Sequence, residues 1–127
     1  MKGVVTSPDA PAALGPYSQA IAAGSLVFCS GQVPIDPQTG ELVDGDVGAQ
    51  TRQVLQNLKA VLGALGLEPG DIVKMTVFMT DLSRITEMNA VYAAFFRENF
   101  PARSTVQVAA LPKGAAVEIE AIALQRC

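Results

Sequence analysis

Hydrophobic and polar residues alternate along the last part of the chain. The stretch Pro101–Leu124 contains two such runs, rich in β-branched residues, on either side of Pro112-Lys113-Gly114. This pattern predicts two strands and a connection. Because residues two apart share a face of an extended chain, each strand has one face with polar or charged side chains. These side chains are Arg103, Thr105 and Gln107 in the first strand, and Glu118 and Glu120 in the second.

Four further short apolar runs are typical of strands. Met1–Ser7 predicts a short edge strand. Ser18–Ala23 and Leu26–Ser30 flank Gly24-Ser25, which predicts a tight hairpin. Ile72–Thr80 is rich in Val, Met, Thr and Phe and predicts a mostly buried strand.

Two segments have the 3.6-residue spacing of an amphipathic helix. The first runs from about Val47 to Leu65, with Asp44 or Asp46 as its N-cap and Gly66 as its stop. The second begins near Asp81 or Ser83 and ends before Pro101. Its apolar stripe consists of Ile85, Met88, Tyr92, Phe95 and Phe96.

The order of these elements predicts an α+β fold. A strand, a helix and another strand follow one another after residue 71, so part of the sheet is expected to be parallel, with a right-handed crossover. Single apolar stripes on both helices predict a two-layer sandwich with a mixed sheet and two helices on one face. The 127 residues suit one domain, 1–127.

Half of the residues are hydrophobic, and the mean hydropathy is +0.32. A chain with this much apolar surface is expected to bury some of it between subunits, on the sheet face that the helices leave open. No run reaches the ~18 apolar residues of a spanning helix, and the first residues lack the apolar core of a signal peptide. We therefore expect a cytoplasmic protein without membrane contact.

The charged residues, the absence of His and the two Cys residues limit the ligands and activities to be expected. The net charge is −3 and the nine basic residues are scattered, which argues against nucleic-acid binding. The chain has no His, the usual general base and the commonest metal ligand. Cys29 and Cys127 make neither a disulfide framework nor a metal set, which fits a reducing compartment.

Arg103 and the two glutamates have two interpretations. One is a structural Arg–Glu ion pair on a half-solvated sheet face. The other is a site in which the Arg103 fork binds a planar anion such as a carboxylate, while a Glu positions or deprotonates something beside it. The residue pattern alone leaves both open.

Three other residues are candidates for the same site. Tyr17 fits a cleft edge, although its residue type alone favours a core position with a satisfied hydroxyl. Gly31, after Ser30, permits close backbone approach by a ligand or marks a bulge. Asn89 lies in the apolar stripe of the second helix, where it caps a loop or reaches a ligand.

Taken together, several segments resemble the RidA (YjgF/UK114) family of small imine and enamine deaminases. The resemblance runs nearly end to end, and it is carried by order and spacing rather than by one motif. The segments are Gly15-Pro16-Tyr17-Ser18-Gln19-Ala20, Cys29-Ser30-Gly31-Gln32, Gly70-Asp71-Ile72-Val73-Lys74, Met88-Asn89-Ala90-Val91-Tyr92, Pro101-Ala102-Arg103-Ser104 and Val117-Glu118-Ile119-Glu120-Ala121.

The resemblance implies a chorismate-mutase-like fold and a homotrimer with clefts at subunit interfaces. It implies that Arg103 binds the carboxylate of 2-imino acids and that Glu118 holds the attacking water, with no metal or organic cofactor. The family's cleft is completed at positions matching Tyr17, Ser30, Gly31 and Thr105, and less certainly Asn89. Thr105 stands where many members carry Cys. If only the backbone at this position acts on water or substrate, Thr105 changes nothing, whereas if the thiol acts, activity or substrate range should differ.

Three other functions compete with an imine deaminase. A regulatory module that binds 2-oxo acids without turnover would need the same Arg103. A nuclease or translation inhibitor, an activity attributed to some relatives, is disfavoured by the acidic balance. A chaperone-like protein would have an exposed apolar patch outside the subunit interface.

Overall fold

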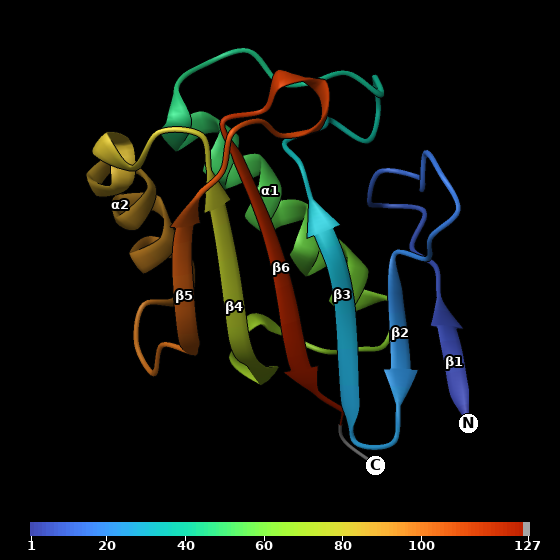
Figure 1. The fold of residues 1–127 in the computed structure, drawn as a ribbon. Helices are drawn as coiled ribbons and strands as arrows, with labels where there is room; N and C mark the ends of the chain where they lie inside the picture. The colour runs from blue at the N-terminus through green and yellow to red at the C-terminus, as the bar shows by residue number, and fades with distance from the viewer. Residues whose placement is uncertain (126–127) are drawn as a thin grey trace.

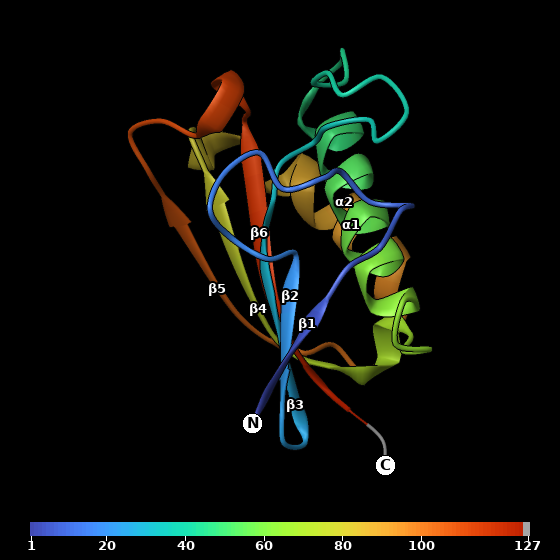
Figure 2. The ribbon, with the colours of Figure 1, turned by 90° about the vertical axis from the view of Figure 1, so that its right-hand side faces the viewer.

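The computed structural model describes residues 1–125 as one six-stranded mixed sheet covered by two helices on one face (Figures 1 and 2). The strand order is β1-β2-β3-β6-β4-β5. All pairs are antiparallel except β4 and β5, which are parallel and are joined through the second helix. The predicted α+β architecture with its parallel unit is confirmed.

The strands lie where the alternating runs predict them. Their bounds are β1 Lys2–Val5, β2 Ala20–Ala23, β3 Leu26–Gln32, β4 Ile72–Met79, β5 Ala102–Gln107 and β6 Val117–Leu124. Gly24 turns the β2–β3 hairpin with a φ of 60°, a conformation that favours glycine. The pairing of β3 with β6 is irregular between Cys29 and Gln32, so the bulge predicted at Gly31 is present.

The first helix, α1, spans Val47–Gly63. Asp46 caps it, because its carboxylate accepts a hydrogen bond from the Ala49 N–H (2.9 Å). The helix ends two residues before the predicted Leu65. Gly66 takes up a φ of 70°, and the Leu67 N–H donates back to the Leu62 carbonyl (3.0 Å), which closes the helix in a Schellman-type turn.

The second helix, α2, spans Ile85–Phe96 and follows a short 3-10 turn, η2, at Leu82–Arg84. Asp81 caps this turn through the Ser83 N–H (3.0 Å). Two more 3-10 turns, η1 (Pro69–Asp71) and η3 (Pro112–Gly114), precede β4 and β6. α2 packs beside α1 on the same face of the sheet (Figure 2).

The core lies between the helices and the sheet. Alternate residues of β4 and β6 are buried beneath α1, as the period of two requires. The largest fully buried side chains include Leu55, Leu58 and Leu62 of α1, Met75, Val77 and Met79 of β4, and Val117 and Ile119 of β6. Cys29 is also buried, and burial raises the pKa of its thiol to about 11, which fits the inert core residue expected for an apolar strand. Cys127 lies outside the described residues.

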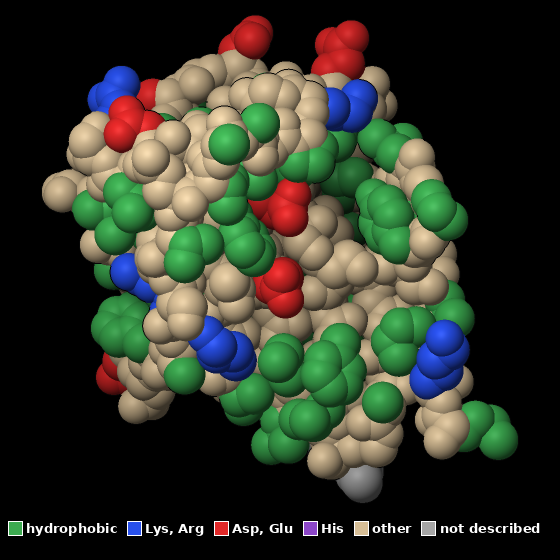
Figure 3. All heavy atoms as spheres, viewed as in Figure 1, with side chains coloured by type: hydrophobic (Ala, Val, Ile, Leu, Met, Phe, Trp, Pro, Cys, Tyr) green, Lys and Arg blue, Asp and Glu red, His purple; other side chains and the backbone are tan. Residues whose placement is uncertain are grey.

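The opposite face of the sheet, here called the outer face, has no helix over it. Hydrophobic side chains gather there around a pair of acidic ones (Figure 3). Phe28, Val106 and Leu124 are each more than 40% exposed. None of the described helices is long and apolar enough to cross a membrane.

Candidate active site

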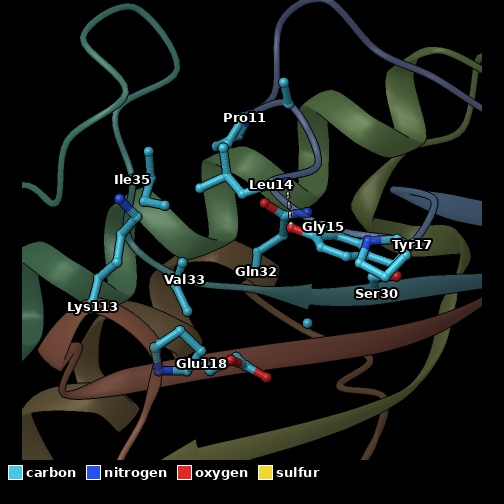
Figure 4. Close-up of a pocket in the computed structure, with 14 residues that line it drawn as sticks. Pro11, Leu14, Gly15, Tyr17, Ser30, Gln32, Val33, Ile35, Lys113 and Glu118 are labelled. Atoms are coloured by element: carbon cyan, nitrogen blue, oxygen red, sulfur yellow. Dashed lines mark hydrogen bonds between the residues drawn. The ribbon is translucent and has the colours of Figure 1, made fainter.

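A cleft of about 520 Å³ lies between the N-terminal loop and the ends of β3 and β6 (Figure 4). One side is polar and carries Glu118 from β6 and Ser30 from β3. The Tyr17 ring, from the N-terminal loop, and Lys113, from η3, also border it. The remaining lining is mostly apolar and includes Pro11, Leu14, Val33 and Ile35.

Glu118 is the acid–base candidate of this cleft. Its side chain is half-buried on the outer face, and burial raises the pKa of its carboxyl group, with a further contribution from the negative charge of Glu120. A carboxyl group with a raised pKa is a better base for water at neutral pH than an ordinary glutamate. Glu118 is therefore suited to hold a water and accept its proton.

Gly31 faces this carboxyl group across the strand pair. A Cβ placed on Gly31 would overlap a Glu118 carboxylate oxygen and would lie 2.9 Å from the carboxyl carbon. Only glycine leaves room for Glu118 in this conformation. The bulge and the close approach, predicted as alternatives, occur together.

Tyr17 lies at the edge of the cleft and is 51% exposed, so the core position favoured by its residue type is wrong. Gly15 and Pro16 directly precede Tyr17, and the loop that they belong to carries the ring at the surface. The Tyr17 hydroxyl accepts a hydrogen bond from the Leu14 N–H (3.3 Å). Ser30 donates its own hydroxyl hydrogen to the Ser18 carbonyl (2.6 Å), so Ser30 fixes the loop beside Tyr17.

Gln19 anchors the same loop and was not singled out from the sequence. Its buried amide donates to the carbonyls of Ser7 (3.2 Å) and Pro11 (2.8 Å), and its carbonyl accepts from the Ser7 N–H (2.6 Å). A glutamine between a proline-rich loop and a strand is the only sequence signal for this anchor.

Lys113, like Gln19, was not predicted as a site residue, and the sequence places it only in a turn. Its backbone has a φ of 59° and is followed by Gly114 at 72°, so the turn holds a non-glycine residue in the left-handed region. Lys113 contributes a positive charge at the border of a cleft that contains Glu118.

Arg103 does not line the cleft that contains Glu118. The β4–β5 register pairs Arg103 with Met75 and so turns it toward the helix layer, whereas the β4–β6 register pairs Glu118 with Phe78 on the outer face. Within the described residues, Arg103 forms no ion pair with a carboxylate. The structural Arg–Glu pair is therefore wrong, and one chain alone does not bring Arg103 and Glu118 together.

Arg103 instead borders a shallow depression of about 310 Å³ formed by α2 and the start of β5. Its guanidinium carbon lies 4.7 Å from the centroid of the Tyr92 ring. Asn89 is exposed in the same depression, on the side of Arg103 and not of Glu118. Thr105 is half-buried two residues further along β5, on the face of Arg103.

The predicted site residues thus fall into two groups. The Glu118 group consists of Tyr17, Ser30, Gly31 and Glu118, and the Arg103 group of Asn89, Arg103 and Thr105. No cluster of three or more metal-ligating side chains occurs between residues 1 and 125. The Arg103 group therefore offers a guanidinium that can bind an anion, and the Glu118 group offers a carboxylate that can act as a base.

Comparison with known proteins identifies the family. The sequence model of the YjgF/RidA family, which carries the description Endoribonuclease L-PSP, matches residues 7–125. The chain belongs to this family. The resemblance carried by the sequence motifs is confirmed.

Relatives match the chain over nearly its whole length. A RutC family protein of Pyrococcus horikoshii is 53% identical over 97% of this chain and 98% of its own length. A Salmonella typhimurium protein named 2-iminobutanoate/2-iminopropanoate deaminase is also 53% identical, over 99% of this chain and its full length.

Solved structures agree with the fold. A putative endoribonuclease of Thermotoga maritima superposes with a TM-score of 0.96 at 50% identity, covering all of both chains. Escherichia coli TdcF with bound serine gives a TM-score of 0.93 at 50% identity, covering 98% of this chain and 99% of that one.

Proposed function

We propose that this protein is an imine deaminase that hydrolyses 2-aminoacrylate-type enamines and their 2-imino acid tautomers to 2-oxo acids and ammonia. The observation that carries the proposal is the half-buried Glu118, whose carboxyl pKa is raised, in a cleft where Gly31 leaves it space. Relatives at 52–53% identity over nearly the whole chain carry the name of this activity.

Arg103 would bind the substrate carboxylate. Its planar guanidinium offers two parallel N–H donors to a carboxylate, and each charge-assisted hydrogen bond is worth about 1.5–3 kcal/mol. Asn89 borders the same depression and is placed to donate to the same substrate. This grip would set the C=N carbon at a fixed distance from the base.

Glu118 would hold the attacking water. As the water oxygen bonds to the C=N carbon, Glu118 takes one of its protons, and the imine nitrogen gains a proton to give a carbinolamine. Collapse of that intermediate breaks the C–N bond, releases ammonia and forms the C=O bond of the 2-oxo acid. A positioned acid or base of this kind typically contributes on the order of 10²–10⁴ in rate, and these steps need no metal or organic cofactor.

We propose further that the complete site forms between subunits of a homotrimer. Arg103 and Glu118 face opposite sides of the sheet, so a neighbouring copy has to supply one of them. The exposed Phe28, Val106 and Leu124 give the outer face an apolar surface of the kind that subunit interfaces bury. The Arg103 group of one subunit would close the Glu118 cleft of the next.

The cellular role follows from the substrate class. Reactive imines of this kind are released by pyridoxal-phosphate-dependent dehydratases, and their hydrolysis would protect pyridoxal-phosphate enzymes from attack. We expect the protein in the cytoplasm, where the buried free thiol of Cys29 suits a reducing compartment.

The first test couples the protein to a purified pyridoxal-phosphate-dependent threonine dehydratase, with semicarbazide as a competing trap for the imine. We expect wild type to accelerate formation of 2-oxobutanoate and Arg103→Ala not to. If wild type binds 2-oxobutanoate without accelerating its formation, a regulatory binding module is the correct function. Cleavage of RNA by wild type, lost at high salt, would instead favour a nuclease.

A mixing experiment tests whether the site is shared. Arg103→Ala and Glu118→Gln subunits, each inactive alone, are unfolded together and refolded. If a cleft takes Arg103 from one subunit and Glu118 from the next, random mixing restores about a quarter of the wild-type activity. Mixtures that stay as inactive as either parent would show that the two residues do not meet across an interface.

A further inference from the structure

The Arg103 side chain rests on an aromatic ring. Its guanidinium carbon lies 4.7 Å from the Tyr92 ring centroid, within the range of a cation–π contact. Tyr92 is only 4% exposed, so the contact lies at the edge of the core and is less screened by water than a surface pair.

The ring is itself held in place by further aromatic residues. Phe96, one turn along α2, lies 4.9 Å from Tyr92 between ring centroids, and Phe100 lies 6.5 Å from Phe96. Tyr92 also belongs to the main hydrophobic core. A ring packed in this way has one orientation, and so does the cation that rests on it.

The contact leaves the hydrogen-bonding groups of Arg103 available. A ring under a guanidinium covers one of its faces, whereas its five N–H donors point outward in its plane. Arg103 has no carboxylate partner within residues 1–125. The contact with the ring therefore restricts the position of the guanidinium and leaves its donors available for a substrate carboxylate.

The Tyr92 hydroxyl lies close to the Arg103 guanidinium but forms no regular hydrogen bond with it. Of the buried side-chain oxygen and nitrogen atoms in the described part of the chain, Tyr92 Oη is the one without a hydrogen-bond partner. Burial raises the pKa of this hydroxyl, and the positive charge and the nearby N–H donors of Arg103 partly oppose the shift, so the phenol stays neutral. The ring makes the cation–π contact with Arg103, and the Tyr92→Phe variant tests the hydroxyl separately.

We propose that Tyr92 is a positioning residue, whose ring holds the Arg103 guanidinium flat so that its in-plane donors meet the substrate carboxylate. This inference rests on the proposed deaminase function and on the role of Arg103 in it. It goes beyond that function because Tyr92 touches Arg103 and not the reacting atoms.

The test compares Tyr92→Leu with Tyr92→Phe. We expect Tyr92→Leu to raise the dissociation constant for 2-oxobutanoate, measured by calorimetry, and the KM in the dehydratase-coupled assay by roughly tenfold, equivalent to about 1.4 kcal/mol. Its kcat should change less than twofold, because the carboxylate grip is similar in the ground and transition states. Tyr92→Phe keeps the ring and should restore wild-type values.

Two controls separate this role from a general loss of packing. Phe95→Leu removes a neighbouring ring of α2 that does not touch Arg103, and it should leave both constants unchanged. In an Arg103→Lys background, which has no planar fork to hold, Tyr92→Leu should have little further effect. A merely structural Tyr92 would lower activity by the same factor in both backgrounds.

The outcomes also separate this proposal from the one on which it rests. If wild type neither binds 2-oxobutanoate nor hydrolyses the imine, the proposed function is wrong. If wild type is active and Arg103→Lys is impaired, but Tyr92→Leu matches wild type, only the positioning role is wrong. An equal rise in KM for Tyr92→Phe and Tyr92→Leu would overturn it too, because the hydroxyl would then be the functional group.

Discussion

The space beside Gly31 is occupied by the carboxyl group of Glu118, so a methyl group on Gly31 would lie 2.9 Å from the carboxyl carbon. We predict that Gly31→Ala displaces the Glu118 carboxylate and lowers kcat in the dehydratase-coupled assay by at least tenfold. The backbone at Gly31 does not require a positive φ, so the substitution itself causes no backbone strain.

Gly63→Ala is the matched control for this substitution. A Cβ on Gly63, at the end of α1, would have no atom within 4 Å. The activity of Gly63→Ala should equal that of wild type. Its stability should equal or slightly exceed that of wild type, because alanine has a higher helix propensity than glycine. Full activity of Gly31→Ala would show that Glu118 does not act from the conformation described here.

The pH dependence of the reaction should report Glu118. If Glu118 acts as the base, as proposed, activity falls as the pH drops through the pKa of its carboxyl group. Burial and the charge of Glu120 raise that pKa, so the acidic limb of the rate profile should lie above the ordinary glutamate value of about 4.3. Glu120→Gln removes the repulsion and should move this limb to lower pH. If Glu120→Gln does not move the acidic limb, that limb reports the ionisation of another group.

The same raised pKa has a consequence for stability. The folded protein binds a proton at Glu118 more tightly than the unfolded chain does, so this residue makes stability fall as pH rises from the unfolded pKa through the folded one. We predict that Glu118→Gln melts at a higher temperature than wild type at pH 7, and that the difference shrinks at pH 4. Equal melting temperatures at both pH values would contradict this expectation.

The apolar outer face should control assembly. Phe28 is 44% exposed in the centre of β3, and Phe28→Asp places a charge where the proposed interface excludes water. Sedimentation should then show monomers, and deaminase activity should drop by more than tenfold. Leu65→Asp, at an exposed apolar residue in the turn that follows α1, should change neither. If the Phe28→Asp monomer is active, the site is not shared between subunits.

Gln19 should couple the N-terminal loop to the core. Gln19→Ala removes three hydrogen bonds and leaves a buried Ser7 N–H without its acceptor, which we expect to lower the free energy of unfolding by about 2 kcal/mol. The looser loop should also weaken binding of 2-oxobutanoate, because it carries Tyr17. Gln107→Ala, which removes one exposed bond to Leu82, should change little. Equal stability of the two variants would contradict the anchor.

The periodicity of the sequence predicts the fold well because each element has its own pattern. Alternation locates β5 and β6, the content of Val, Met, Thr and Phe locates β4, and a single apolar stripe locates α1, which ends two residues earlier than predicted because Gly66 closes the helix from outside. Alternation also places Arg103 and Glu118 on polar faces of their own strands. It does not say that these faces lie on opposite sides of the sheet, since that depends on how β5 and β6 each pair with β4.

The parts of the site that were missed depend on contacts between distant segments. Tyr17 is among the predicted site residues, but its residue type favours a core position, and only the path of the proline-rich loop exposes it. Gln19 becomes an anchor because Ser7 and Pro11 fold back over it, and Tyr92 is a platform because β5 passes beside α2. Such pairings carry no local signal in a single sequence.

The opposite placement of Arg103 and Glu118 also limits the symmetry that any assembly can have. A two-fold axis joins one surface patch to its own copy, whereas the proposed shared site requires two different surfaces of the subunit to meet. Such head-to-tail contacts either close into a ring or continue as a filament. The angle between the β5 edge and the outer face therefore decides whether the proposed assembly closes as a small particle or continues as a polymer. Substitutions that alter the twist of β4 and β5 put the solubility of the protein at risk as well as its activity.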